Sequence, residues 1–226
     1  MNKKIIIFGT TMFSAEIAEI MRMEEARVGG AEIVGFVVDR QYKNCDIFQN
    51  LPVFAFENIE EQVDINAVQF ILTLGYSNMN EHRQAKFNYC KSRGYKVFTY
   101  VSQHAQVFTD KVGEGSIILP GTYIGPYSEV GVCTVIRPGT VLAHHDSIGD
   151  FNWIADGCTF GGGVKVGSHC FLGLGTTVRN EITIADYTFA GAQTYLGLNT
   201  ESHSAYIGVP SRKIPDKDSI EVVTHV

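Results

Sequence analysis

Two neighbouring histidines and a carboxylate form the part of this sequence that is best suited to chemistry. His144 and His145 precede Asp146, and a run of three glycines, Gly161–Gly163, begins eighteen residues after Ala143. An imidazole can act as a general base near neutral pH, and glycines leave backbone N–H groups accessible. If the two segments are adjacent, a ligand carbonyl could approach backbone donors and a base together.

A repeat of six residues places these segments side by side. Fifteen aliphatic or small residues recur at this spacing from Val112 to Leu196 without a slip. Helices and ordinary strands have other periods, whereas a parallel β-helix has short strands of this spacing, three to a coil. Residues 112–201 are therefore predicted to form about five coils of about eighteen residues. Gly161–Gly163 would then stack on Ala143, His144 and His145.

The inward-pointing position, four residues after each aliphatic one, makes Asp146 unusual. Small side chains such as Ser128, Thr140 and Cys158 occupy most of these positions, and Asp146 is the only charged residue among them. Burial of a carboxylate is costly unless the group is paired or protonated. Its place beside the histidines and the glycine run favours a functional site. The alternative is that the glycines only build a corner and the histidines are ordinary surface residues.

Composition and charge exclude several classes of function. The chain has 226 residues, 45% of them hydrophobic, and a formal net charge of −6 without a dense run of Lys or Arg. These values argue against binding to nucleic acid or to an anionic membrane. Neither a signal-peptide pattern nor an apolar stretch of membrane-spanning length is present, so we expect no membrane insertion. Five cysteines without a CxxC pair are typical of a reducing, cytoplasmic location.

The first hundred residues have a different pattern. Apolar strands are predicted at 3–8, 33–38, 68–74 and 96–101, with helical segments between them that include 57–63 and 78–92. This alternation is typical of a small Rossmann-like α/β domain with a parallel sheet. We therefore predict an α/β domain over residues 1–103, a β-helix domain over 104–214 and a polar C-terminal tail over 215–226.

The carboxyl ends of the strands in such a sheet are the usual place for a ligand. The residues that mark this edge here are Gly9, Thr10, Thr11, Asp39 and Gly75. The dinucleotide fingerprint GxGxxG is absent, which argues against NAD. A smaller nucleotide group could bind with Thr10 and Thr11 near a phosphate and Asp39 near a ribose or base. Alternatively, Asp39 only ends a strand.

An α/β domain joined to a hexapeptide β-helix that carries His144–Asp150 (HHDSIGD) and ends in Ile207–Ser211 (IGVPS) resembles the bacterial sugar acyltransferases. These include N-acetyltransferases of nucleotide-linked amino sugars and sialic acid O-acetyltransferase-like proteins, and the resemblance covers nearly the whole chain. It implies a left-handed β-helix, a homotrimer and acetyl-CoA bound as co-substrate between neighbouring subunits. It also implies a nucleotide sugar held by the N-terminal domain and a role in polysaccharide biosynthesis.

The resemblance assigns roles to individual residues of the β-helix. His144 matches the catalytic base, and His145 stands where many members have an acidic residue that orients the base. Gly162 and Ala192 match positions whose backbone N–H groups meet acetyl-CoA, and Gly163 belongs to the same glycine run. The two cations after the Gly-x-Pro turn are Arg212 and Lys213. They could meet the phosphates of the coenzyme or be solvated.

Three departures from the family pattern leave the substrate open, and one of them is an N-terminal glycine-rich loop that is reduced to Gly9. Arg137 and Pro138 replace an Asn-Thr pair near the sugar, and Trp153 replaces a common histidine. Arg137 could reach a phosphate or carboxylate, or be solvated.

The predicted reaction is acetyl-CoA-dependent N-acetylation of a nucleotide-linked amino sugar. The amine attacks the thioester directly while His144 takes its proton, and His145, Asp146 or a residue of the adjoining subunit orients the base. An O-acetyltransferase of a sugar or of sialic acid is the alternative, and a non-catalytic binding protein is a remote one. A carbonic anhydrase-type metal site needs three converging histidines, and the spacing of His144, His145 and His169 does not fit. We expect no metal.

Overall fold

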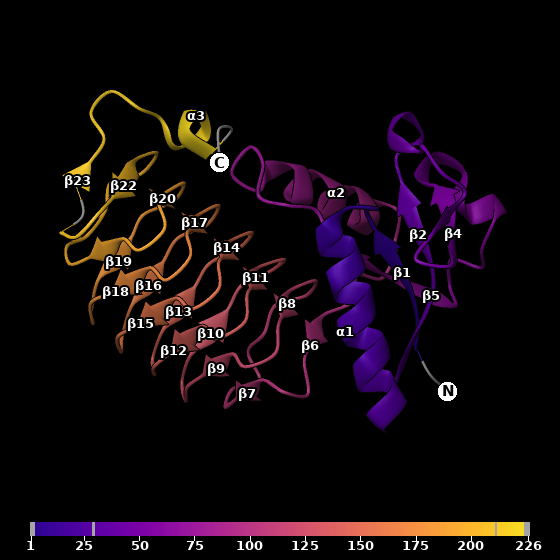
Figure 1. Cartoon of the computed structure of the whole chain (residues 1–226), viewed down its shortest axis with the longest axis horizontal. Coiled ribbons are helices and arrows are strands. Elements are labelled where there is room, and N and C mark those ends of the chain that lie inside the picture. The colour runs from indigo at the N-terminus through magenta and orange to yellow at the C-terminus, as the bar shows by residue number, and fades with distance from the viewer. Residues whose placement is uncertain (1–2, 29, 211, 224–226) are drawn as a thin grey trace. The chain divides into compact units, whose positions relative to one another are not determined.

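The computed structural model describes residues 3–28, 30–210 and 212–223 (Figure 1). The chain divides into two compact units, one of residues 1–75 and 85–98 and the other of residues 76–84 and 99–226. The division thus lies a few residues before the predicted boundary at 103, and residues 76–84 belong to the second unit.

The first unit is an α/β unit with a parallel sheet at its centre. Its strands are β1 (Lys3–Phe8), β2 (Ala31–Val38), β3 (Ile47–Phe48), β4 (Leu51–Ala55) and β5 (Val68–Leu72), in the order β3-β4-β2-β1-β5. All neighbouring strands are parallel except β3 and β4, which form an antiparallel hairpin. The helical segments are α1 (Met12–Val28), η1 (Arg40–Tyr42), η2 (Phe56–Glu61) and α2 (Glu81–Ser92).

Two details of this unit differ from the sequence-based expectation. Strand β4, which begins at Leu51-Pro52, is not among the strands predicted from the sequence; it forms because Val53 and Ala55 alternate inward and a proline is tolerated near the start of a strand. The prediction of one continuous fourth strand over 96–101 is also wrong. Val97 makes an isolated bridge to Phe70, whereas β6 (Tyr100–Val101) pairs with a strand of the β-helix.

The second unit is a parallel β-helix in which two-residue strands recur every six residues (Figure 1). Its early strands are β7 (Gln106–Val107), β8 (Ile117–Ile118), β9 (Tyr123–Ile124), β10 (Glu129–Val130), β11 (Val135–Ile136), β12 (Val141–Leu142), β13 (Ser147–Ile148) and β14 (Trp153–Ile154). They continue as β15 (Thr159–Phe160), β16 (Lys165–Val166), β17 (Phe171–Leu172), β18 (Thr177–Val178), β19 (Thr183–Ile184), β20 (Phe189–Ala190) and β21 (Tyr195–Leu196).

From β8 to β18, each strand pairs with the strand eighteen residues further along, as Val135 with Trp153 and Val141 with Thr159. The strands form three sheets, one for each side of the coil: β10-β13-β16-β19, β6-β8-β11-β14-β17-β20-β22-β23 and β7-β9-β12-β15-β18-β21. The second residue of each strand in the register is buried, and these residues form the core. The predicted hexapeptide β-helix is confirmed, and its left-handedness stays a prediction.

The C-terminal part of the chain closes the last coil. β22 (Ala205–Ile207) continues the ladder in parallel, and β23 (Arg212–Lys213) pairs with it antiparallel. A short helix, α3 (Ser219–Val223), lies within the segment predicted as a polar tail. Among the helices of the described residues, none has both the length and the apolar character needed to cross a bilayer.

The segment 76–84 packs on one sheet of the β-helix. The Tyr76 ring lies 5.2 Å from that of Trp153, so this tryptophan, which departs from the family pattern, has a packing role. Arg83 is fully buried and donates to the carbonyl oxygens of Cys133 (2.9 Å) and Asn152 (3.0 Å). Burial lowers the pKa of the Arg83 guanidinium to about 10. The segment is therefore held by a desolvated cation that carbonyl groups solvate in place of water.

Candidate active site

The two histidines lie at the corner that follows β12, which we call the histidine corner (residues 143–146). Their Nδ1 atoms are 3.1 Å apart and their rings are perpendicular. His145 has a φ of 56°, and its ring stacks on that of Tyr127 at 4.7 Å. Both imidazoles are exposed. The left-handed backbone at His145 therefore turns the two rings towards each other, and Tyr127 supports the second one.

Gly162 lies directly beside the His144 ring, as the register of eighteen predicts. The N–H of Gly163 donates to the carbonyl oxygen of His144 at 2.9 Å. A Cβ atom at position 162 would lie 2.3 Å from Cε1 and 2.7 Å from Nε2 of His144, so only glycine leaves room for the ring. Within the described residues, no hydrogen bond engages the N–H of Gly162. The His144 imidazole, a possible base, thus lies next to Gly162, whose N–H has no hydrogen-bond partner among the described residues.

Asp146 points into the coil and not towards the histidines. Its side chain is 0% exposed, and Oδ1 accepts a hydrogen bond from the N–H of Val164 at 2.8 Å. Burial raises the pKa of the Asp146 carboxyl, and nearby backbone N–H groups, foremost that of Val164, and His144 partly oppose the rise. No hydrogen bond joins it to an imidazole in the part of the chain that the structure describes. Asp146 therefore supports the histidine corner from the interior of the coil, through its hydrogen bond with Val164.

Arg137 and Ala192 lie at corners of another side of the coil, those that follow strands of the eight-stranded sheet. The Arg137 guanidinium pairs with Asp156, with Nε 3.0 Å from Oδ2. Its partner is thus a carboxylate of the same chain, in the next coil. Ala192 is exposed. Within one chain, the structure does not bring either residue to the histidine corner.

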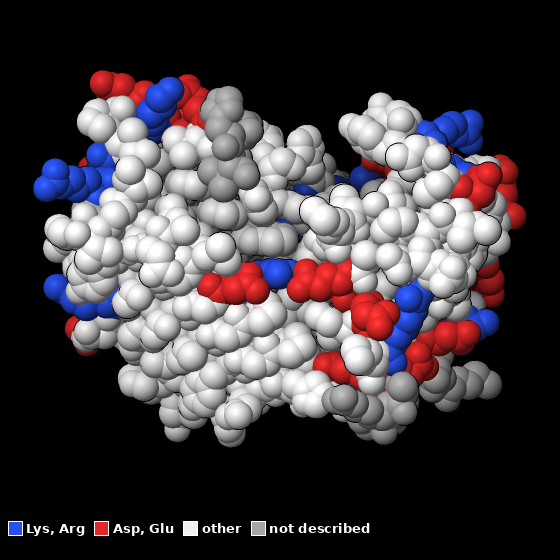
Figure 2. All heavy atoms as spheres, in the orientation of Figure 1, with Lys and Arg blue, Asp and Glu red and all other residues white. Residues whose placement is uncertain are grey.

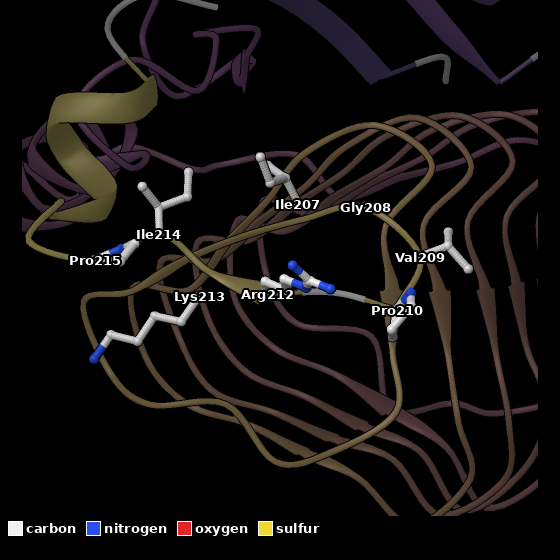
Figure 3. A pocket seen from close by; sticks show the side chains of 8 residues that line it. All are labelled: Ile207, Gly208, Val209, Pro210, Arg212, Lys213, Ile214 and Pro215. Atoms are coloured by element: carbon white, nitrogen blue, oxygen red, sulfur yellow. The ribbon is translucent and has the colours of Figure 1, made fainter.

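Arg212 and Lys213 lie on β23 and line a pocket of about 480 Å³ with Ile207–Pro210 (Figure 3). Both are exposed, and Lys213 forms an ion pair with Glu201. Lys213 extends away from Val209 and Pro210 in Figure 3. It also borders a second pocket together with Arg179. Arg179 was not among the residues predicted from the sequence, although it follows the register residue Val178 as Arg137 follows Ile136.

The loop after β1 uses its hydroxyl groups to cap helix α1. Thr11 Oγ1 accepts from the N–H of Ser14 at 3.3 Å, and Ser14 Oγ accepts from the N–H of Thr11 at 3.2 Å, a reciprocal capping arrangement. Gly9 has a φ of 126°, and a Cβ atom there would lie 2.7 Å from Ser14 Oγ. Thr11 therefore has a structural role, and Thr10 is half-buried beside it.

Asp39 follows β2 and pairs with Lys86 of α2, with Oδ1 2.6 Å from Nζ. The Lys86 ammonium also lies 4.9 Å from the ring centroids of Phe8 and Phe56. Lys86 was not among the residues predicted from the sequence, since helical spacing alone does not show which side of a helix meets the sheet edge. At Gly75, a Cβ atom would meet nothing within 4 Å, so space does not require glycine there.

The charges of the described residues form no metal site and no basic patch on the face shown. Within the described residues, no three or more His, Cys, Asp or Glu side chains are grouped to hold a metal ion. His169 is buried and stacks between Phe151 and Tyr187 at 5.3 and 4.7 Å. Figure 2 shows Lys and Arg interspersed with Asp and Glu rather than gathered together.

Comparison with known structures identifies the fold. The chain superposes on the acetyltransferase domain of PglB from Neisseria gonorrhoeae with a TM-score of 0.83 and 19% identity, over 94% of this chain and 100% of that one. For GDP-perosamine N-acetyltransferase from Caulobacter crescentus the TM-score is 0.82 and the identity 20%, over 94% and 97%. This is the fold of sugar acyltransferases.

A third structure with this fold is WeeI from Acinetobacter baumannii, with a TM-score of 0.76 and 15% identity over 94% of this chain and 100% of that one. No protein-family model and no curated protein sequence matches the chain. The shared fold thus spans nearly the whole chain, with 94% of it covered in each of these three comparisons.

Proposed function

We propose that this protein is an acetyl-CoA-dependent acyltransferase that N-acetylates a nucleotide-linked amino sugar. The observation that carries the proposal is the His144 ring beside the unbonded N–H of Gly162, in a fold shared with sugar acyltransferases. The C. crescentus enzyme was solved with CoA and GDP-perosamine, and the PglB domain with acetyl-CoA. Both facts support acetyl-CoA as co-substrate and a nucleotide-linked amine as acceptor here.

The contact between the two Nδ1 atoms supports the tautomer that the base needs. The distance of 3.1 Å is that of a hydrogen bond, in which one of these nitrogens carries the proton and the other is the acceptor. When His144 is the donor, its Nε2 is unprotonated and can take the proton of the attacking amine. His145 then acts as the acceptor, in the place of the acidic residue that orients the base in many family members.

The N–H of Gly162 would stabilise the oxyanion that forms when the amine attacks the thioester carbonyl. One such donor contributes about 3 kcal/mol of transition-state stabilisation. The tetrahedral intermediate formed by this attack then collapses and expels the CoA thiolate. The proton held by His144 can pass to the departing sulfur. The remaining rate enhancement comes from holding the acceptor and the thioester together.

The other predicted contacts to acetyl-CoA need a neighbouring subunit. Ala192 and His144 lie at corners of different sides of the coil, so one chain alone does not join them. A homotrimer, in which one side of a subunit meets another side of its neighbour, would place them at one interface. Gly163 and Ala192 would line the coenzyme, and Arg212 and Lys213 would meet its phosphates.

The edge of the α/β sheet is the proposed place for the nucleotide part of the acceptor. Gly9, Thr10, Asp39 and Gly75 lie at the ends of its strands, and Lys86 adds a cation beside Asp39. In this proposal Lys86 takes the phosphate contact that the sequence suggested for Thr11. The reaction would take place in the cytoplasm, in polysaccharide biosynthesis.

A thiol-release assay with acetyl-CoA tests this function. The acceptors are UDP-, dTDP- and GDP-linked amino sugars, with sialic acid and plain hexoses for comparison. We expect turnover with one nucleotide-linked amine. Turnover only with hydroxyl acceptors would retain the acyltransferase and replace N- by O-acetylation, and no turnover with any of them would contradict the proposal.

A further inference from the structure

The polar side chains that point into the β-helix share one hydrogen-bond pattern. Most of them donate to the backbone carbonyl fifteen residues ahead or three residues behind, whereas Thr194 donates to that of Tyr206, twelve residues ahead. Ser116 Oγ donates to the carbonyl of Gly131 at 2.7 Å, and even the Cys158 thiol donates to that of Gly173 at 3.3 Å. Each of these positions therefore presents carbonyl oxygens to its side chain and favours a donor.

Asn152 shows how a planar side chain meets this pattern, at the inward position that follows Asp146. Its Oδ1 accepts from the N–H of Cys170, eighteen residues ahead, at 2.7 Å. Its Nδ2 donates to the carbonyls of Gly149 and Gly167, three behind and fifteen ahead, at 2.9 and 2.8 Å. The amide thus uses one acceptor and two donors.

Asp146 reproduces only the acceptor half of this arrangement. Its Oδ1 accepts from the N–H of Val164, also eighteen residues ahead. Its Oδ2 is fully buried and has no hydrogen-bond partner among the described residues. In the register of the coil, the carbonyls that correspond to the two acceptors of Asn152 are those of Ala143 and Gly161. An ionised carboxylate cannot donate to them, whereas a protonated carboxyl can.

The surroundings of Asp146 supply no cation in place of that proton. At this side of the coil, the titratable side chains nearest in the register are His144, His145, Glu129 and Lys165, and the nearest inward positions add the thiols of Cys158 and Cys170. Tyr127, which stacks on His145, is exposed. The two thiols are neutral, because burial raises the pKa of each to about 12. The other four side chains are exposed, and Glu129 and Lys165 occupy outward positions of their strands.

We propose that Asp146 is an uncharged carboxylic acid in the folded protein and donates its Oδ2 proton to the carbonyl of Ala143 or Gly161. Ala143 precedes His144, and Gly161 precedes Gly162. A hydrogen bond from Asp146 to either carbonyl would therefore stabilise the backbone next to the base or next to the oxyanion donor. Asp146 is thus a positioning residue, and its ionisation loosens the histidine corner. The protonation stands on the register alone, whereas its effect on catalysis rests on the proposed function.

The pH dependence of stability tests the protonation, with Asp146→Asn as the variant that donates without titrating. The folded wild type keeps its proton to higher pH than the unfolded chain, so its stability falls as pH rises between the two pKa values. Each unit between those values changes the unfolding equilibrium about tenfold. At equal protein concentration, D146N should have the higher Tm near pH 8, and the difference should shrink towards about pH 4.

Asn152→Asp is the matched control, because it places a carboxyl in the neighbouring position. Its Oδ2 would meet the carbonyls of Gly149 and Gly167, so N152D should have a lower Tm than the wild type near pH 8 and approach it in acid. A Tm difference that is independent of pH, in either variant, would overturn the proposal.

Infrared spectra of the wild type give a second readout that does not depend on a variant folding. The carbonyl stretch of a protonated carboxyl should persist after exposed carboxyls have ionised, and D146N should lack it. Absence of this band from the wild type would overturn the proposed protonation.

The kinetic readout is the pH profile of kcat/KM for acetyl transfer. Wild type should lose kcat/KM at alkaline pH in a limb that D146N lacks. Identical profiles would overturn the positioning role and leave the protonation standing. A wild type without acetyl transfer would contradict the proposed function, while the stability and infrared tests would still decide the protonation.

Discussion

The contact between His144 and Gly162 is the residue-scale feature on which the proposed chemistry depends. The sequence could predict it, because a strict register of eighteen residues states which positions stack. It could not predict the Nδ1 contact with His145, since that depends on the left-handed φ of 56° at this residue. Nor could it show that Arg137 pairs with Asp156 or Asp39 with Lys86, because these partners are distant in sequence or depend on rotamers.

At this scale we predict that Gly162→Ala removes acetyl transfer and retains the fold. The new methyl group would lie 2.3 Å from the His144 ring, whose end can swing away from the site. Displacement of the base should lower kcat/KM by about a hundredfold or more. Steady-state kinetics and a thermal melt check this together.

Gly113→Ala is the contrasting variant. A Cβ atom there would lie 2.4 Å from the backbone of Gly131, which cannot swing aside. This variant should therefore lose stability first. Unchanged kinetics in Gly162→Ala would show that the ring position is not needed for catalysis.

At the scale of elements, the β-helix could be predicted from the hexapeptide repeat, because each coil contacts only its neighbours and repeats their pattern. The α/β unit could be predicted less completely from the sequence. The apolar run 96–101 has the composition of a strand, yet Tyr100 and Val101 pair with Ile117 and Ile118 in the β-helix. Strand propensity does not state which sheet a strand joins. The packing of residues 76–84 on the β-helix could not be predicted either, because the sequence of this segment has no periodic pattern that indicates it.

We expect Arg83→Met to destabilise the protein through this segment. The change leaves the carbonyl groups of Cys133 and Asn152 without their donor in a buried place. Loss of these bonds should lower the free energy of unfolding by about 2–4 kcal/mol. Urea unfolding measures the change.

Arg93→Met is the matched control, because Arg93 is half-exposed and pairs with Glu60 near the surface. It should leave the unfolding midpoint almost unchanged. Equal effects of the two substitutions would contradict a structural role for the buried guanidinium.

At the scale of the whole molecule, the proposed site requires more than one copy of the chain. His144 and Ala192 lie at corners of different sides of the coil, and both are exposed. A site that uses both residues must therefore join neighbouring subunits. The sequence pointed to this assembly only through the family resemblance, because a repeat pattern describes one chain and not its contacts with copies.

Subunit complementation tests this assembly. His144→Ala and Ala192→Trp should each be nearly inactive alone, the first without its base and the second with acetyl-CoA blocked. After co-refolding, mixed trimers contain interfaces at which both residues are wild type, so part of the activity should return. No recovery, in mixtures shown by mass to contain both chains, would place the whole site within one subunit.

The turnover number of His144→Ala with the best acceptor, measured together with acetyl-CoA binding by calorimetry, tests whether His144 is the catalytic base. We predict that the variant keeps acetyl-CoA binding and the native mass while kcat falls by about a hundredfold or more, as expected for loss of a general base. A kcat close to that of the wild type, with the same bound acetyl-CoA, would contradict the assignment of His144 as the base.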